Sequence, residues 1–163
     1  MKNGICALVL ACLVGLAAPA RAGDSTLMLG GGTWETLRSK YLTEEFDAFY
    51  RPDLSLLWFI KPQAGVMVAG DGDYYVFGGL RADVPLGGRF ILTPNANIGG
   101  YGGGGYHLGS HFEFRTGVDL AYRFDNGLRL GVGFYHISNA GITRDNGGSE
   151  SLLGEVSIPL AFP

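Results

Sequence analysis

Residues 112–124 alternate strictly between two kinds of side chain, and this alternation restricts the fold more than any other feature of the sequence. Successive side chains of a β-strand point to opposite faces, so a two-residue period predicts a strand with two different faces. One face is apolar apart from a single threonine, and the other is charged or small. The first consists of Phe112, Phe114, Thr116, Val118, Leu120, Tyr122 and Phe124, and the second of Glu113, Arg115, Gly117, Asp119, Ala121 and Arg123.

The rest of the chain contains further strand-like segments and no helical period sustained over several turns. Asp125-Asn126-Gly127 predicts a tight hairpin, and Pro85-Leu86-Gly87-Gly88 predicts another short turn. The intervening connections are longer or richer in glycine, apart from the short stretch 70–73. This asymmetry is typical of outer-membrane β-barrels with both termini in the periplasm. The eight predicted segments are 24–34, 45–51, 60–69, 74–84, 89–101, 110–124, 128–138 and 150–161.

A soluble lipocalin-like barrel would also have eight up-and-down strands, but with an apolar cavity and a wet exterior. The composition of the polar face separates the two architectures. A narrow interior needs small residues and charges that pair with one another, whereas a solvent-exposed face usually favours lysine. We therefore expect an all-β fold, an eight-stranded antiparallel up-and-down transmembrane β-barrel with its polar face inside. That face carries Arg81, Arg115, Arg123, Arg129, Asp83, Glu113, Asp119 and Glu155, together with Gly65, Gly79, Gly99, Gly117, Gly131 and Gly133.

Aromatic residues near the predicted strand ends are consistent with girdles at the two membrane interfaces. Phe90, Tyr122, Phe124 and Phe162 lie near the short turns, and Trp34, Tyr74 and Phe112 lie near the long loops.

Residues 1–22 are predicted to be a cleaved signal peptide. Lys2 precedes an apolar stretch, and Ala20-Arg21-Ala22 forms an A-x-A cleavage site. Both cysteines, Cys6 and Cys12, lie in this segment, so the barrel domain 23–163 needs no disulfide. Without Lys2 and Arg21, ten basic residues face fifteen acidic ones, a net charge of −5. This balance argues against a nucleic-acid partner.

His136, Ser138 and Glu150 are polar residues at positions where the alternation predicts the lipid-facing side. An imidazole, a hydroxyl and a carboxylate are the parts of a nucleophilic triad. His136 lies two residues from Ser138 on one strand face, and Glu150 begins the neighbouring antiparallel strand, directly or diagonally opposite. Asn139 follows Ser138, and its side chain or nearby backbone N–H groups, helped by the flexible Ala140-Gly141, would supply an oxyanion site.

The same residues also suit a polar collar that only anchors lipid headgroups, so a non-catalytic structural barrel is the alternative function. His107 and His111 flank a glycine-rich loop without carboxylates at ligand spacing, and we predict no metal or cofactor. Arg38, Lys40 and Arg144 are either contacts for anionic headgroup phosphates or solvated loop charges.

The C-terminal part of the sequence resembles the PagL family of lipid A 3-O-deacylases, which are eight-stranded outer-membrane esterases. The resemblance spans Arg123 to Leu160 and is carried by His136-Ile137-Ser138-Asn139-Ala140-Gly141, Asn146-Gly147-Gly148-Ser149-Glu150 and Ile158-Pro159-Leu160. It implies a bacterial outer-membrane location and a serine esterase that acts on lipopolysaccharide in the outer leaflet. It further implies that His136 is the base, Ser138 the nucleophile, Glu150 the orienting acid and Asn139 the oxyanion residue. Whether the barrel forms a homodimer is left open.

Overall fold

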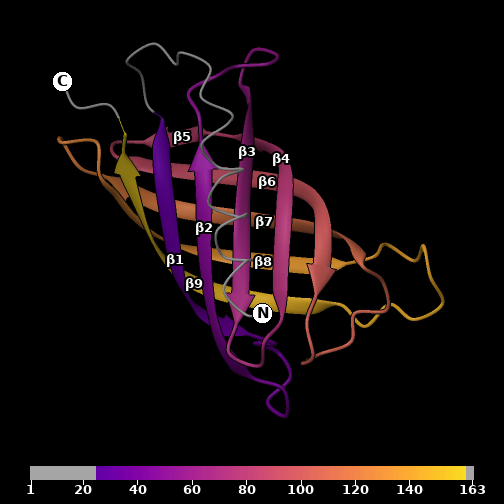
Figure 1. Ribbon diagram of the computed structural model, residues 1–163. Helices are drawn as coiled ribbons and strands as arrows, with labels where there is room; N and C mark the ends of the chain where they lie inside the picture. Colours follow the sequence, from indigo (N-terminus) through magenta and orange to yellow (C-terminus); the bar gives the residue numbers. More distant parts are fainter. Residues whose placement is uncertain (1–24, 161–163) are drawn as a thin grey trace, which may run out of the picture.

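The computed structural model describes residues 25–160, which form nine β-strands closed into one barrel (Figure 1). The predicted signal peptide, both cysteines and Phe162 lie outside the described residues. Residues 25–160 include no helix that is long and apolar enough to cross a membrane. The strands are β1 (Thr26–Trp34), β2 (Thr43–Arg51), β3 (Ile60–Ala69), β4 (Tyr74–Ala82), β5 (Val84–Gly87), β6 (Phe90–Gly102), β7 (Phe112–Arg123), β8 (Arg129–Ser138) and β9 (Ser149–Pro159).

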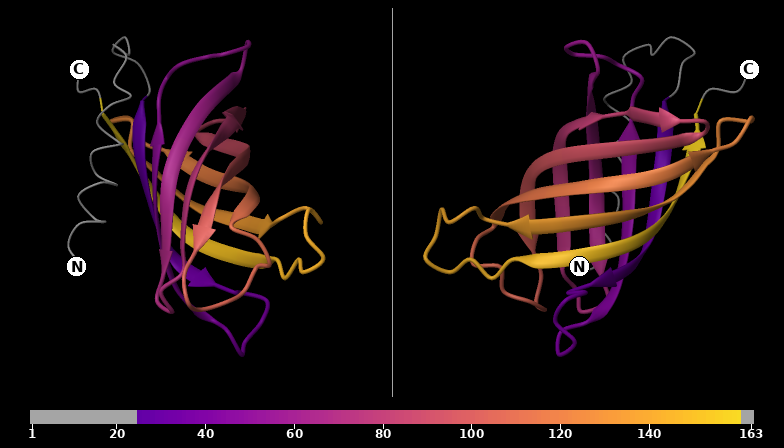
Figure 2. Two further views of the ribbon diagram at one scale, coloured as in Figure 1. Left: turned by 45° about the vertical axis from the view of Figure 1, so that its right-hand side comes forward. Right: turned by 180° about the vertical axis from the view of Figure 1, so that it is seen from behind.

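The strands follow the order β4-β3-β2-β1-β9-β8-β7-β6-β5, and pairing of β4 with β6 closes the ring (Figure 2). All of these pairings are antiparallel. The short strand β5 follows β4 after Asp83 and also pairs with β6. Strands β4 and β5 therefore occupy a single strand position in the barrel. The predicted eight-stranded closed barrel is therefore confirmed, with the fourth strand interrupted at Asp83.

The interior of the barrel is filled with paired charges, as the alternation predicts. The fully buried Arg115 guanidinium lies 2.8 Å from Glu45 and 2.7 Å from Asp47. Arg51 pairs with Asp119 at 2.6 Å, and all five side chains are buried. A buried charge is tolerated only when partners replace its lost hydration, so these pairs explain how a narrow lumen holds so many ionisable groups.

Two of the predicted interior glycines make room for a large ring. A Cβ atom at Gly117 would lie 2.2 Å from Cδ1 of Tyr135, and one at Gly133 would lie 2.1 Å from Oε1 of Glu155. The Tyr135 hydroxyl reaches Asp119 at 2.5 Å and Glu155 at 2.6 Å across this space. Small residues on the polar face are thus required by the side chains that cross the lumen.

The exterior is apolar along the strands, with Phe112, Val118 and Val132 among its exposed residues. Trp34 is the exception to the predicted girdles, because its side chain is completely buried and lies 6.4 Å from the ring of Tyr101. The even-numbered positions of β1 face inward, as the buried Met28 shows, and Trp34 shares that parity. The prediction that Trp34 faces lipid is therefore wrong.

Candidate active site

The three triad candidates lie together on the outer face of the barrel, where β8 ends and β9 begins. His136 and Glu150 are direct partners in the β8–β9 ladder, and Ser138 is the last residue of β8. The His136 side chain is 46% exposed and that of Glu150 is 17% exposed, whereas the flanking Tyr135, Ile137 and Ser149 are buried. A slip of one residue in this register would turn the triad residues toward the lumen, so the ladder itself fixes their orientation.

Glu150 holds one nitrogen of the histidine ring. Its Oε1 lies 3.1 Å from Nδ1 of His136, within hydrogen-bond distance. When Nδ1 carries the proton and donates it to the carboxylate, the lone pair of Nε2 is left available as a base. The backbone carbonyl of Glu150 also accepts a hydrogen bond of 2.9 Å from the N–H of Thr36, which fixes the start of β9 against the loop after β1.

Ser138 is half-buried beside His136 and faces Phe114 across the β7–β8 ladder. Among the described residues, no hydrogen bond joins its hydroxyl to the imidazole of His136, whose Nδ1 is engaged by Glu150. Residues two apart on a strand are separated by about 7 Å at Cα. Catalytic hydrogen bonds are often long in the absence of substrate, so this arrangement is compatible with a Ser138–His136 contact in the substrate complex.

The chain turns sharply directly after Ser138. The N–H of Ile142 donates to the carbonyl of Asn139 at 3.1 Å, and the two residues at the corner, Ala140 and Gly141, have φ values of 54° and 79°. A left-handed alanine costs about 1–2 kcal/mol relative to a right-handed one, so the surrounding contacts must enforce this conformation. The turn places a constrained backbone segment next to the candidate nucleophile.

Asn139 is the residue that organises this turn from the buried side. Its Nδ2 group lies 2.9 Å from the Thr143 hydroxyl and 2.7 Å from the carbonyl of Asp145, and its Oδ1 accepts from the N–H of Gly141 at 2.9 Å. The backbone N–H of Asn139 donates to Oδ1 of Asn146 at 3.1 Å. The side-chain amide is therefore engaged within the loop, which favours the backbone as the source of oxyanion donors.

Arg38 binds the backbone of the loop that precedes Glu150. Its Nη1 donates to the carbonyl of Gly148 at 2.5 Å and its Nη2 to the carbonyl of Gly147 at 2.8 Å. Nη1 also lies 3.1 Å from the buried Glu35 and 3.0 Å from the Tyr106 hydroxyl. Burial raises the pKa of Glu35, while the hydrogen bond and charge of Arg38 oppose that rise. The sequence pattern suits Arg38 only as a headgroup contact or a solvated charge and does not reveal this role, because its partners are backbone carbonyls about 110 residues away.

Gly148 is the point where this loop meets the candidate base. A Cβ atom at Gly148 would lie 3.2 Å from Cε1 of His136, and its φ of 58° favours glycine. The imidazole thus rests against a turn that Arg38 holds in place.

The other sequence candidates lie in the loops at the same end of the barrel as the triad. His107 and His111 are exposed in the loop between β6 and β7, where Nδ1 of His111 lies 3.2 Å from the carbonyl of Tyr101. Lys40 lies over the ring of Tyr41, and Arg144 is exposed. Within residues 25–160, no three His, Cys, Asp or Glu side chains gather at distances suited to a metal ion.

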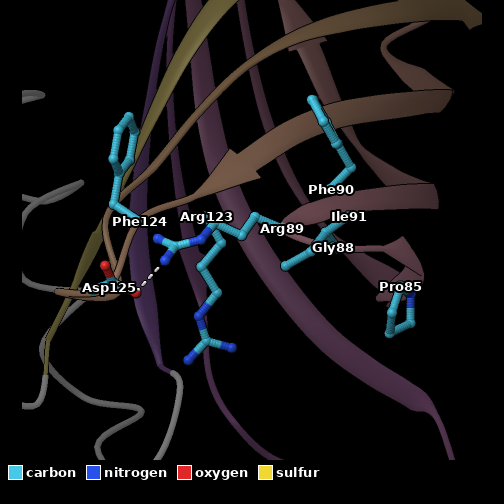
Figure 3. A pocket seen from close by; sticks show the side chains of 8 residues that line it. All are labelled: Pro85, Gly88, Arg89, Phe90, Ile91, Arg123, Phe124 and Asp125. Carbon is cyan, nitrogen blue, oxygen red and sulfur yellow. Dashed lines mark ion pairs between the residues drawn. The ribbon is translucent and has the colours of Figure 1, made fainter.

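A hollow at the opposite end of the barrel contains none of the triad candidates (Figure 3). Arg89 lines it and pairs with Asp125 at 2.7 Å, and Phe90 and Phe124 border it. Both aromatic rings are exposed, as expected for the girdle near the short turns.

The model of the PagL family, lipid A 3-O-deacylase, matches residues 53–159, a range that contains all three triad candidates. A search of curated proteins gives no match.

Solved structures share the architecture at low sequence identity. A crystal structure of the outer membrane enzyme PagL has a TM-score of 0.61 and 19% identity, covering 83% of this chain and 99% of that one. A crystal structure of Neisserial surface protein A has a TM-score of 0.66 and 10% identity, covering 85% and 98%. A de novo designed transmembrane β-barrel has a TM-score of 0.53 and 12% identity, covering 82% and 95%. These similarities establish the fold.

Proposed function

Because this chain belongs to the PagL family of lipid A 3-O-deacylases, we propose that it is a serine esterase in which Ser138, His136 and Glu150 form the catalytic triad. The chain is a β-barrel of the bacterial outer membrane. Its substrate would be lipopolysaccharide in the outer leaflet, and the bond cleaved would be the ester at the 3-position of lipid A. The triad faces the lipid side of the barrel, so the substrate would approach laterally within the membrane.

The first half of the reaction forms an acyl-enzyme. Oγ of Ser138 attacks the ester carbonyl while Nε2 of His136 takes its proton, and Glu150 stabilises the resulting imidazolium through Nδ1. The tetrahedral oxyanion is stabilised by backbone N–H groups in the turn that Asn139 organises. When the intermediate collapses, the C–O bond to the sugar breaks and His136 returns the proton to the leaving hydroxyl.

The second half regenerates the enzyme. A water molecule gives a proton to Nε2 of His136 and attacks the acyl carbon, and the released Ser138 oxygen recovers that proton. The products are the hydroxy fatty acid and a lipid A with a free 3-hydroxyl. The His136 side chain is 46% exposed, which supports these steps because both water and substrate must reach its imidazole.

The observation that carries the proposal is the 3.1 Å contact between His136 and Glu150 on the outer face of the barrel, two residues from a hydroxyl. A headgroup-anchoring collar would need polar residues at this level but not a carboxylate aligned with one nitrogen of a histidine ring.

Mass spectrometry of lipid A from cells with and without the protein tests the proposal. Cells producing the wild-type chain should contain lipid A lighter by one hydroxyacyl chain, and cells producing folded Ser138→Ala should not. A folded wild-type barrel that leaves lipid A unchanged would support the structural alternative. Loss of a chain from a different position would refute the assignment of the bond.

A further inference from the structure

The connection between β2 and β3 ends in an exposed apolar turn at the barrel end opposite the triad (Figures 1 and 2). We call residues 54–59 the apolar tip; its sequence, Leu54-Ser55-Leu56-Leu57-Trp58-Phe59, contains no charge. Trp58 is 91% exposed, Leu57 68% and Phe59 58%. Contiguous exposed apolar side chains of this size mark an interaction surface on a native protein.

The apolar tip has a defined shape. The N–H of Ile60 donates to the carbonyl of Leu57 at 2.8 Å, and the N–H of Leu56 donates to the carbonyl of Ile60 at 2.8 Å. Trp58 stands at the corner with a φ of 50°, a left-handed conformation that glycine adopts far more easily. The turn thus holds a bulky indole outward at a position where a small residue would be less strained.

Polar contacts secure the base of the apolar tip to the rim of the barrel. Nζ of Lys61 lies 2.5 Å from Oδ1 of Asp53 and 4.0 Å from Asp83. Arg81, which is buried in the barrel, donates to the carbonyl of Pro52 at 3.0 Å. The charged groups at the base of this connection are therefore paired at the barrel rim, and the apolar side chains remain exposed.

Around β2, the outward apolar face of the barrel is shorter than the apolar band of a membrane unless the apolar tip is included. On β7, the outward apolar face runs from Phe112 to Phe124, which corresponds to about 30 Å along the membrane normal for tilted strands. On β2, it runs only from Phe46 to Tyr50, about 10 Å by the same conversion, whereas a transmembrane barrel needs an apolar band of about 25 Å. The apolar tip continues beyond the end of β2 (Figure 1) and supplies the apolar side chains that β2 itself lacks at this end of the barrel.

We propose that the apolar tip inserts into the inner leaflet of the outer membrane and anchors the periplasmic end of the barrel there. Trp58 lies at the boundary between headgroups and acyl chains, a depth that tryptophan prefers. The occupant of this surface is thus the lipid of the membrane that already surrounds the barrel, and the inference is independent of the esterase chemistry.

Tryptophan fluorescence tests this directly, because the chain has only two tryptophans and Trp34 is buried inside the barrel. The mature chain carrying Trp34→Phe is folded into phosphatidylcholine vesicles whose acyl chains are brominated near the headgroup. Bromine should quench more than half of the Trp58 emission, whereas iodide on both sides of the membrane should quench little. If Trp34→Phe does not fold, the difference between the wild type and Trp58→Phe reports the same quantity.

Asn126 offers a matched control, since it lies in the β7–β8 turn at the same end of the barrel. A tryptophan introduced by Asn126→Trp in the Trp58→Phe background should respond to iodide and not to bromine. Strong iodide quenching of Trp58 without bromine quenching would place the apolar tip in water and overturn the proposal. Resistance to both quenchers that disappears on dilution of the protein in lipid would show contact with a second copy instead, and would overturn it equally.

Discussion

Replacing Glu150 by glutamine tests whether the contact between Glu150 and His136 orients the imidazole for catalysis. Glutamine has nearly the same shape, so the β8–β9 ladder should form as before, but the side chain loses its charge. Its amide group can also donate toward Nδ1 of His136, which would favour the tautomer with the proton on Nε2. In that tautomer the histidine cannot accept the proton of Ser138.

The geometry sets the size of the effect. Nδ1 of His136 and Oε1 of Glu150 are 3.1 Å apart, and centres of charge about 4 Å apart attract by about 4 kcal/mol at an effective dielectric constant near 20 and about 1 kcal/mol in water. His136 is 46% exposed and Glu150 17% exposed, so the environment lies between these limits. A loss of about 2–3 kcal/mol of imidazolium stabilisation corresponds to about a 30- to 150-fold lower kcat. The tautomer effect adds to this loss, and Glu150→Asp should be milder because only its reach is shortened.

The assay is release of hydroxy fatty acid from purified lipopolysaccharide, measured by mass spectrometry on protein whose heat-modifiable migration shows a folded barrel. Glu155→Gln is the matched control, because Glu155 is buried in the lumen 2.6 Å from the Tyr135 hydroxyl and should leave kcat unchanged. A folded Glu150→Gln enzyme with wild-type turnover would refute the orienting role. Loss of turnover in Glu155→Gln alone would move the catalytic carboxylate to the interior.

Three further outcomes are expected. Ser138→Ala and His136→Ala should each lower deacylation by about three orders of magnitude or more, and the double variant should lose little beyond either, because triad members act as a unit; additive losses would contradict a shared mechanism. A cysteine that replaces Thr143, in the β8–β9 loop, should react with a membrane-impermeant thiol reagent on intact cells, because this loop is expected outside the cell. A cysteine that replaces Asn126, in the β7–β8 turn, should not react, because this turn is expected in the periplasm. The reverse labelling pattern would mean that the barrel has the opposite orientation. Arg115→Met should lower the free energy of unfolding by about 3–5 kcal/mol, because it leaves two buried carboxylates without their cation; a urea midpoint equal to that of the wild type would show that the lumen pairs contribute no net stability.

Which side chains face lipid and which face the lumen follows from the sequence alone. The two-residue period is a local property of an extended backbone, so the parity of Arg115, Tyr135 and Glu155 could be read without knowing their partners. The same parity placed His136, Ser138 and Glu150 on the outer face. The prediction for Trp34 rested on its aromatic character near a strand end and not on its position in the alternation. It failed because an aromatic residue near a strand end fits either face.

Which residues meet across the barrel follows only from the three-dimensional fold. The ion pair between Arg115 and Glu45 joins positions about 70 residues apart, and the hydrogen bond from Arg38 to the Gly148 carbonyl joins positions about 110 residues apart. Such contacts depend on strand register and on ring closure, which are set by the whole set of ladders and loops rather than by any local pattern. For the same reason the sequence left Glu150 either directly or diagonally opposite His136, and the closed barrel places it directly opposite, within hydrogen-bond distance of the imidazole.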